Sequence, residues 1–143
     1  MKPNSDFKKE RVNVYIIGCT NRPDLLDSAM TRPGRLDRAI YVGLPNGEER
    51  HEMFELLAKS MPIPTDEVSL NSLVALTDNF SFAEIRLASR EAALCALREN
   101  LSSSQITLSH FSAALAKTKP RPIPQYLQDI YRRFAGQVEV GTM

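Results

Sequence analysis

The residues best suited to chemistry lie between positions 20 and 38, where Asn21 is followed by Arg32 and Arg35. Asn21 ends an apolar run, and α/β sheets place their ligand contacts at the ends of such strands. The two arginines flank a Pro-Gly turn, so both guanidinium groups can point outward. A guanidinium offers a planar fork of donors that fits a phosphate. The pattern therefore indicates contacts with a phosphate group.

Each of these features also has a simpler interpretation. Asn21 can merely begin a turn, because asparagine side chains hydrogen-bond readily to nearby backbone. The arginines can form surface ion pairs with Asp27 and Asp37, and such pairs are common. On the residues alone, both interpretations stay open.

The flanking sequence predicts two strands of a parallel sheet. Residues 12–20 are almost all apolar or β-branched, as in a strand buried on both faces. Residues 39–44 predict a second short strand, and a short helical stretch is expected between them at residues 25–30. Two short strands cannot cover two faces and two edges. Further strands are therefore expected from a longer parent protein or from a partner.

From residue 47 onward the apolar spacing is helical. One helix is expected over residues 47–60, and Ser69 is the expected N-cap of the next. Ser81 opens a third helix in a capping box with the glutamate three residues on. A fourth begins near Thr107, and a last helix follows the proline-rich residues 120–124. The residues expected to face inward are Met53, Phe54, Leu56, Leu57, Leu70, Leu73, Val74, Ile85, Ala88, Ala92, Ala96, Phe111, Ala114, Leu115, Leu127, Ile130, Tyr131 and Phe134.

Composition argues against several functional classes. The 18 basic and 17 acidic side chains give a net charge of +1, without the broad basic surface of a nucleic-acid binder. Cys19 and Cys95 lie far apart in apolar stretches, as expected for buried thiols in a reducing compartment. His51 and His110 have no neighbours at ligand spacing, so no metal site is expected. No apolar run approaches the roughly 18 residues that span a bilayer, so a cytoplasmic or nuclear protein is expected.

The segment over residues 20–38 closely resembles the sensor-1 to arginine-finger segment of the AAA ATPase family. The resemblance implies that Asn21 helps to place the attacking water near the γ-phosphate of ATP. It also implies that Arg32 and Arg35 reach into the ATP site of a neighbouring subunit. An arginine supplied in this way is worth roughly 10³–10⁵ in rate. Arg38 lies just beyond the motif and is interpreted as structural.

The helical half resembles the lid of the same family, whose third helix begins Gly-aromatic-Ser-Gly-Ala-Asp beside the adenine. The corresponding residues 79–84 read Asn-Phe-Ser-Phe-Ala-Glu. By resemblance, Asn79, Phe82 and Ala83 are the candidate nucleotide contacts. Two family glycines are replaced, by Asn79 and Phe82. Phe82 can stack on the base, block its approach, or pack in the core of the lid.

The end of the chain narrows the resemblance. Residues 106–134 are similar to the end of the second ATPase domain in tandem AAA proteins of the valosin-containing-protein class. Within that class the chain is most similar to the spermatogenesis-associated AAA ATPases, which are related to a fungal factor of ribosome maturation. The implied partners are neighbouring subunits of a homo-oligomeric, hexameric ring, together with protein substrates or adaptors. Neither a membrane nor direct nucleic-acid binding is expected.

Two motifs that such an ATPase needs are absent from the sequence. A P-loop requires Gly-Lys, and none of the six glycines is followed by lysine. A Walker B motif requires a buried strand ending in Asp-Glu, but the only such pair, Asp66-Glu67, follows a proline-rich stretch. ATP with Mg²⁺ is therefore expected in the parent protein. The chain alone is expected neither to bind it tightly nor to hydrolyse it.

The predicted fold is an α/β fragment followed by an all-α part: the C-terminal strands of a P-loop NTPase parallel sheet, then a small AAA helical lid bundle. The expected division is a linker or surface loop (1–11), a partial α/β subdomain (12–46), the lid (47–119) and a proline-rich turn, helix and tail (120–143). The expected function is that of an AAA ATPase region that couples hydrolysis to remodelling or unfolding of protein complexes. The alternative is a non-catalytic module that binds neighbouring subunits or adaptors.

Overall fold

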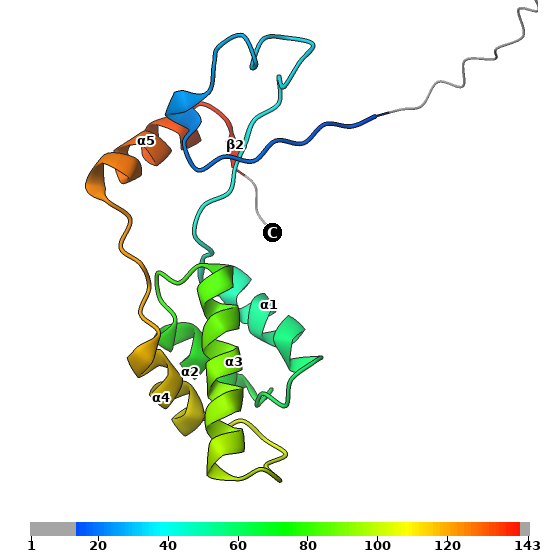
Figure 1. Ribbon diagram of the computed structural model, residues 1–143, viewed down its shortest axis with the longest axis vertical. Helices are drawn as coiled ribbons and strands as arrows, with labels where there is room; N and C mark the ends of the chain where they lie inside the picture. Colours follow the sequence, from blue (N-terminus) through cyan, green and yellow to red (C-terminus); the bar gives the residue numbers. More distant parts are fainter. Residues whose placement is uncertain (1–13, 141–143) are drawn as a thin grey trace, which may run out of the picture.

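The computed structural model describes residues 14–140, which form two parts along the long axis of the molecule (Figure 1). One part is a bundle of four helices, and the other gathers the N-terminal segment around the last helix. The elements in chain order are η1 (Pro23–Leu25), β1 (Ile40–Tyr41), α1 (Gly47–Ala58), α2 (Glu67–Leu76), α3 (Phe82–Glu99), α4 (Leu108–Lys117), α5 (Gln125–Ala135) and β2 (Glu139–Val140). The linker expected over residues 1–11 lies outside the described residues, as do positions 12, 13 and 141–143.

All four helices contribute to the core of the bundle, and the most extensive packing is between α3 and α4. The expected inward face of α3, formed by Ile85 and three alanines, is buried as predicted. Small side chains allow α4 to approach closely, and its Phe111 meets Phe54 of α1 edge-to-face with ring centroids 6.1 Å apart. Burying each of these rings stabilises the fold by roughly 1.5–3 kcal/mol. The prediction for Leu56 is wrong, because this side chain lies two residues, or about 200° around the helix, from Phe54 and is exposed.

Two of the predicted helix N-caps are confirmed and one is wrong. Ser81 and Glu84 form the predicted capping box, and Thr107 precedes α4 as expected. The predicted cap at Ser69 is wrong. The side chain of Asp66 accepts the backbone N–H of Ser69 at 2.9 Å, so α2 begins three residues earlier than expected. Aspartate and serine are both good N-cap residues, and the helix uses Asp66, which lies nearer the preceding prolines.

A buried arginine that the sequence did not single out joins α1 to α2. Arg50 is only 8% exposed. Its guanidinium donates to the carbonyl oxygens of Pro45 at 3.0 Å and Val74 at 3.3 Å, and it pairs with Asp78 at 3.5 Å. A buried guanidinium requires several acceptors to offset its desolvation. Arg50 therefore fixes the start of α1 against the end of α2.

The predicted strand over residues 12–20 is not formed in its described part, residues 14–20. Its apolar side chains are exposed, with Tyr15 at 89% and Ile17 at 88%. A strand needs a neighbour for its backbone hydrogen bonds, and nothing in the described chain pairs with this segment. Cys19 is exposed for the same reason, contrary to the expected burial.

The second predicted strand is present but shorter. β1 covers two of residues 39–44 and pairs in parallel with β2, which no sequence pattern predicted. The helix expected at residues 25–30 is also wrong. Its place is taken by η1 and a following turn, in which Met30 N donates to Asp27 O at 2.8 Å. The last helix, α5, follows the prediction and ends at Gly136.

Glu84 links the start of α3 to the segment that leads into α5. One carboxylate oxygen accepts the backbone N–H of Ser81 at 2.8 Å, and the other accepts that of Arg121 at 2.9 Å. Partial burial raises the pKa of Glu84, but the hydrogen bonds from Ser81 and Arg121 outweigh it and lower the pKa overall. The ionised carboxylate is therefore the form that the fold favours.

Glu84→Gln should flatten the acid branch of the stability curve. The folded-state pKa of Glu84 lies below its ordinary value of 4.5, so its contribution is present above that pH and is lost as pH falls through the folded value. Urea denaturation at several pH values should show a steeper acidic loss in the wild type than in the variant. Glu52→Gln removes an exposed carboxylate of α1 and serves as control. Identical acid branches for the two variants would contradict the assignment.

Candidate functional site

Asn21 lies two residues before the start of η1, and its backbone is held firmly while its side chain is free. The carbonyl oxygen of Asn21 accepts the hydroxyl of Tyr131 at 2.9 Å. The N–H of Arg22, on the same peptide group, donates to the hydroxyl of Thr20 at 3.0 Å. The side-chain amide is exposed, and no hydrogen bond to it is found within residues 14–140. The amide is therefore available to an external ligand.

An ion pair fixes the turn that follows. The guanidinium of Arg22 binds the carboxylate of Asp24 through two hydrogen bonds of 2.8 and 2.7 Å. This hydrogen bonding raises the pKa of Arg22 and lowers that of Asp24. Both groups face solvent, so the pair adds little to global stability. Its effect is local, because it closes η1 directly after Asn21.

The turn that carries Arg32 and Arg35 is braced by backbone contacts. Arg35 N donates to Arg32 O at 3.1 Å, and Gly34 has a φ of +82°, which favours glycine. The carboxylate of Asp37 accepts Gly34 N at 3.0 Å, and that of Asp27 accepts the N–H two residues on at 2.8 Å. Both aspartates are thus engaged with backbone. The surface ion pairs that were the simpler interpretation of the arginines are not formed.

The two arginines differ in what they contact. Arg35 donates from Nη1 to the carbonyl oxygen of Ala29 at 2.7 Å and so holds the loop closed. The guanidinium of Arg32 is exposed, and no acceptor for it occurs among the described side chains and backbone. No hydrogen bond joins either arginine to Asn21 in this part of the chain. Arg32 is therefore the freer of the two to bind an anion outside the loop.

The other candidate residues lie around the start of α3, at the end of the bundle nearer α5 (Figure 1). Asn79 has a φ of +61°, in the left-handed region that glycine and asparagine tolerate best. It therefore keeps the backbone shape that the glycine of the resembled motif would give. Phe82 is half-buried and Ala83 is exposed.

Asn79→Ala should destabilise the bundle by about 1–2 kcal/mol, because alanine strains at positive φ. Asn79→Gly should cost much less or nothing. Urea denaturation of the three proteins measures the difference. Asn71→Ala, at an exposed position within α2, controls for loss of an asparagine side chain. Equal stability of the alanine and glycine variants at position 79 would rule out the backbone explanation.

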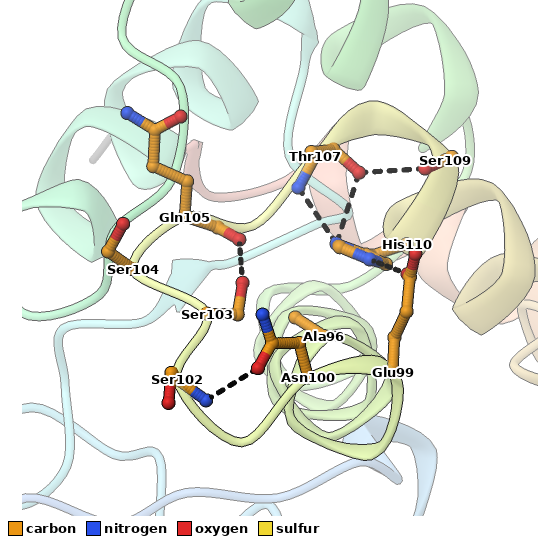
Figure 2. A pocket seen from close by; sticks show the side chains of 10 residues that line it. All are labelled: Ala96, Glu99, Asn100, Ser102, Ser103, Ser104, Gln105, Thr107, Ser109 and His110. Carbon is orange, nitrogen blue, oxygen red and sulfur yellow. Dashed lines mark hydrogen bonds and ion pairs between the residues drawn. The ribbon is translucent and has the colours of Figure 1, made fainter.

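An open hollow of about 440 Å³ lies at the opposite end of α3 (Figure 2). Figure 2 shows Glu99 and His110 meeting at its wall, with Nε2 of the histidine 2.7 Å from Oε2 of the glutamate. Nδ1 of His110 accepts the N–H of Thr107 at 3.0 Å. These groups cap α4 and tie it to α3, so their polar atoms are already used. None of the predicted site residues lines this hollow.

Comparisons with known proteins identify the family. Residues 3–44 match the model of the ATPase family associated with various cellular activities (AAA), and residues 67–113 match that of the AAA+ lid domain. The chain belongs to the AAA family, as a fragment of an AAA domain with its helical lid. This confirms the fold class expected from the sequence.

Two relatives and one solved structure illustrate the similarity. The chain is 46% identical over 131 residues to human ATPase family gene 2 protein homolog A, covering 92% of this chain and 14% of that protein. It is 37% identical over 126 residues to the Schizosaccharomyces pombe ATPase family gene 2 protein, covering 88% and 15%. The crystal structure of the FIGL-1 AAA domain in complex with ADP superposes with a TM-score of 0.70 at 25% identity, covering 84% of this chain and 43% of that one.

The chain corresponds to a small part of each of these curated relatives. It spans only 14% and 15% of the length of the two curated relatives. Their names agree with the resemblance to the spermatogenesis-associated type of AAA protein. Within residues 14–140, no helix combines the length and apolarity needed to cross a membrane.

Proposed function

We propose that this chain is the C-terminal region of a ring-forming ATPase that couples ATP hydrolysis to remodelling or unfolding of protein complexes. The observation that carries the proposal is the free guanidinium of Arg32, held on a turn whose carboxylates are engaged with backbone N–H groups. A guanidinium with no internal acceptor suits an external phosphate. The ATPase names of the relatives and the ADP bound by the FIGL-1 domain support a nucleotide as that ligand.

Each loop residue has its own proposed role. The amide of Asn21 orients the water that attacks the γ-phosphate of ATP, giving ADP and phosphate. Arg32 enters the site of the neighbouring subunit and stabilises charge on the transferred group. Arg35 acts beside it, since one hydrogen bond to Ala29 leaves the other donors of its fork available.

Nucleotide contact by the lid is also part of the proposal. Asn79, Phe82 and Ala83 lie at the start of α3 and would face the adenine, with Phe82 stacking on the base. ATP and Mg²⁺ would be held mainly by a P-loop and a Walker B motif, which this sequence does not contain. The chain's own residues thus fit part of a nucleotide site: the phosphate-facing arginines, the water-orienting amide and the lid.

On the basis of resemblance to the family, we also propose a homo-oligomeric, hexameric ring, a cytoplasmic or nuclear location, and protein substrates or adaptors as partners. The same resemblance supports a role in ribosome maturation. The second candidate function is a non-catalytic module that binds neighbouring subunits or adaptors. The exposed apolar side chains of residues 14–17 favour it, because such a segment can dock on another chain.

Arg32→Ala in the full-length protein should leave ATP binding nearly intact while hydrolysis by this domain falls by roughly 10³–10⁵. Arg32→Lys should recover little, because an ammonium lacks the planar fork. Arg35→Ala should also reduce hydrolysis, with an added loss of loop order because the contact with Ala29 disappears. Steady-state hydrolysis and nucleotide titration together measure the effects.

Arg38→Ala, at an exposed position just beyond the turn, is the matched control and should hydrolyse ATP normally. Loss of nucleotide binding in the Arg32 variant would show that its role has been misplaced. Normal hydrolysis in that variant would favour the non-catalytic module instead.

A further inference from the structure

We propose that Tyr131 of α5 is a positioning residue for hydrolysis, and that its hydroxyl holds Asn21 in the orientation needed to place the attacking water. The inference rests on the proposed function, because it takes the amide of Asn21 as the group that orients water. It extends that function to the C-terminal helix, which touches none of the reacting atoms. The helix becomes part of the machinery through one hydrogen bond across 110 residues of sequence.

The peptide group between Asn21 and Arg22 is restrained at both of its polar atoms. Its oxygen accepts Tyr131 Oη at 2.9 Å, and its N–H donates to Thr20 Oγ1 at 3.0 Å. A peptide group is planar, so holding both atoms fixes the backbone angles on either side of it. Those angles set the direction of the Cα–Cβ bond of Asn21, from which its side-chain amide extends. Of the two restraints, only the one from Tyr131 comes from outside the loop.

Tyr131 is itself supported from two directions. α5 packs on η1, which begins two residues after Asn21. On the other side, the ring of Tyr131 lies against that of Tyr41 in β1, with centroids 6.3 Å apart. β1 in turn pairs with β2, which follows α5 in the chain. The packing of α5 and of the Tyr131 ring therefore restrains the position of the hydroxyl.

The hydroxyl and the ring of Tyr131 can be separated experimentally. Tyr131→Phe keeps the ring against Tyr41 and removes only the donor to the Asn21 carbonyl. A displacement of about 1 Å in a positioned group can cost roughly 10²-fold in rate. In the full-length protein, we expect kcat for ATP to fall roughly 10- to 100-fold, with KM and the melting temperature nearly unchanged. Tyr126→Phe removes a hydroxyl from a 58% exposed ring of the same helix and should leave kcat unchanged.

A double-mutant cycle with Asn21→Ala completes the test. If Tyr131 acts through Asn21, then Tyr131→Phe should add little further loss once the amide is gone. An equal loss in both backgrounds would overturn the proposal, because Tyr131 would then act independently of Asn21. The proposal would also be overturned if Asn21→Ala lowers kcat but Tyr131→Phe has the same kcat as the control Tyr126→Phe. If Asn21→Ala leaves kcat unchanged, the proposed role of Asn21 fails, and the positioning role falls with it.

Discussion

The close approach of α3 to α4 is the constraint on which the bundle depends. It is possible because Ala88, Ala92 and Ala96 present so little bulk on the buried face of α3. A larger side chain there would force the helices apart and lose the dispersion contacts that a close-packed interior supplies. Ile85, the paired rings of α1 and α4, and Leu70 and Leu73 of α2 belong to the same core. The bundle is thus a closed unit, to which the rest of the described chain is attached.

Within residues 14–140, the other part of the molecule has no comparable core of its own. Its apolar segment over residues 14–17 is exposed, and its order comes from α5 and the short β1–β2 pair. Two hydrogen bonds lie along the path from the bundle to Asn21. Glu84 of α3 accepts the backbone N–H of Arg121, which precedes α5, and Tyr131 of α5 donates to the backbone carbonyl of Asn21. In the proposed function these bonds connect the end of the lid that would face the nucleotide with the loop that would orient water.

The sequence predicted what depends on local chemistry. The capping box at Ser81 and the alanine spacing of α3 were sufficient to place that helix, and the apolar stripe placed α5. It could not predict features that depend on distant partners. β2 is too short to show an alternating pattern in the sequence. Arg50 can be buried only because backbone carbonyl oxygens accept its hydrogen bonds in the folded chain. Tyr131 contacts a loop that lies far away in sequence. The segment over residues 14–20 was predicted as a strand because its composition suits burial, yet pairing requires neighbours that the described chain lacks.

The central claim is that Arg32 acts on nucleotide bound by another subunit, and mixed rings test it most directly. Full-length subunits carrying Arg32→Ala would be combined with subunits that cannot bind ATP but keep Arg32. Neither population alone should hydrolyse ATP at this domain. Mixing them should restore activity, because an intact Arg32 then faces an occupied site. Mixtures that form rings but stay inactive at every ratio, or Arg32→Ala rings that are active alone, would contradict the account.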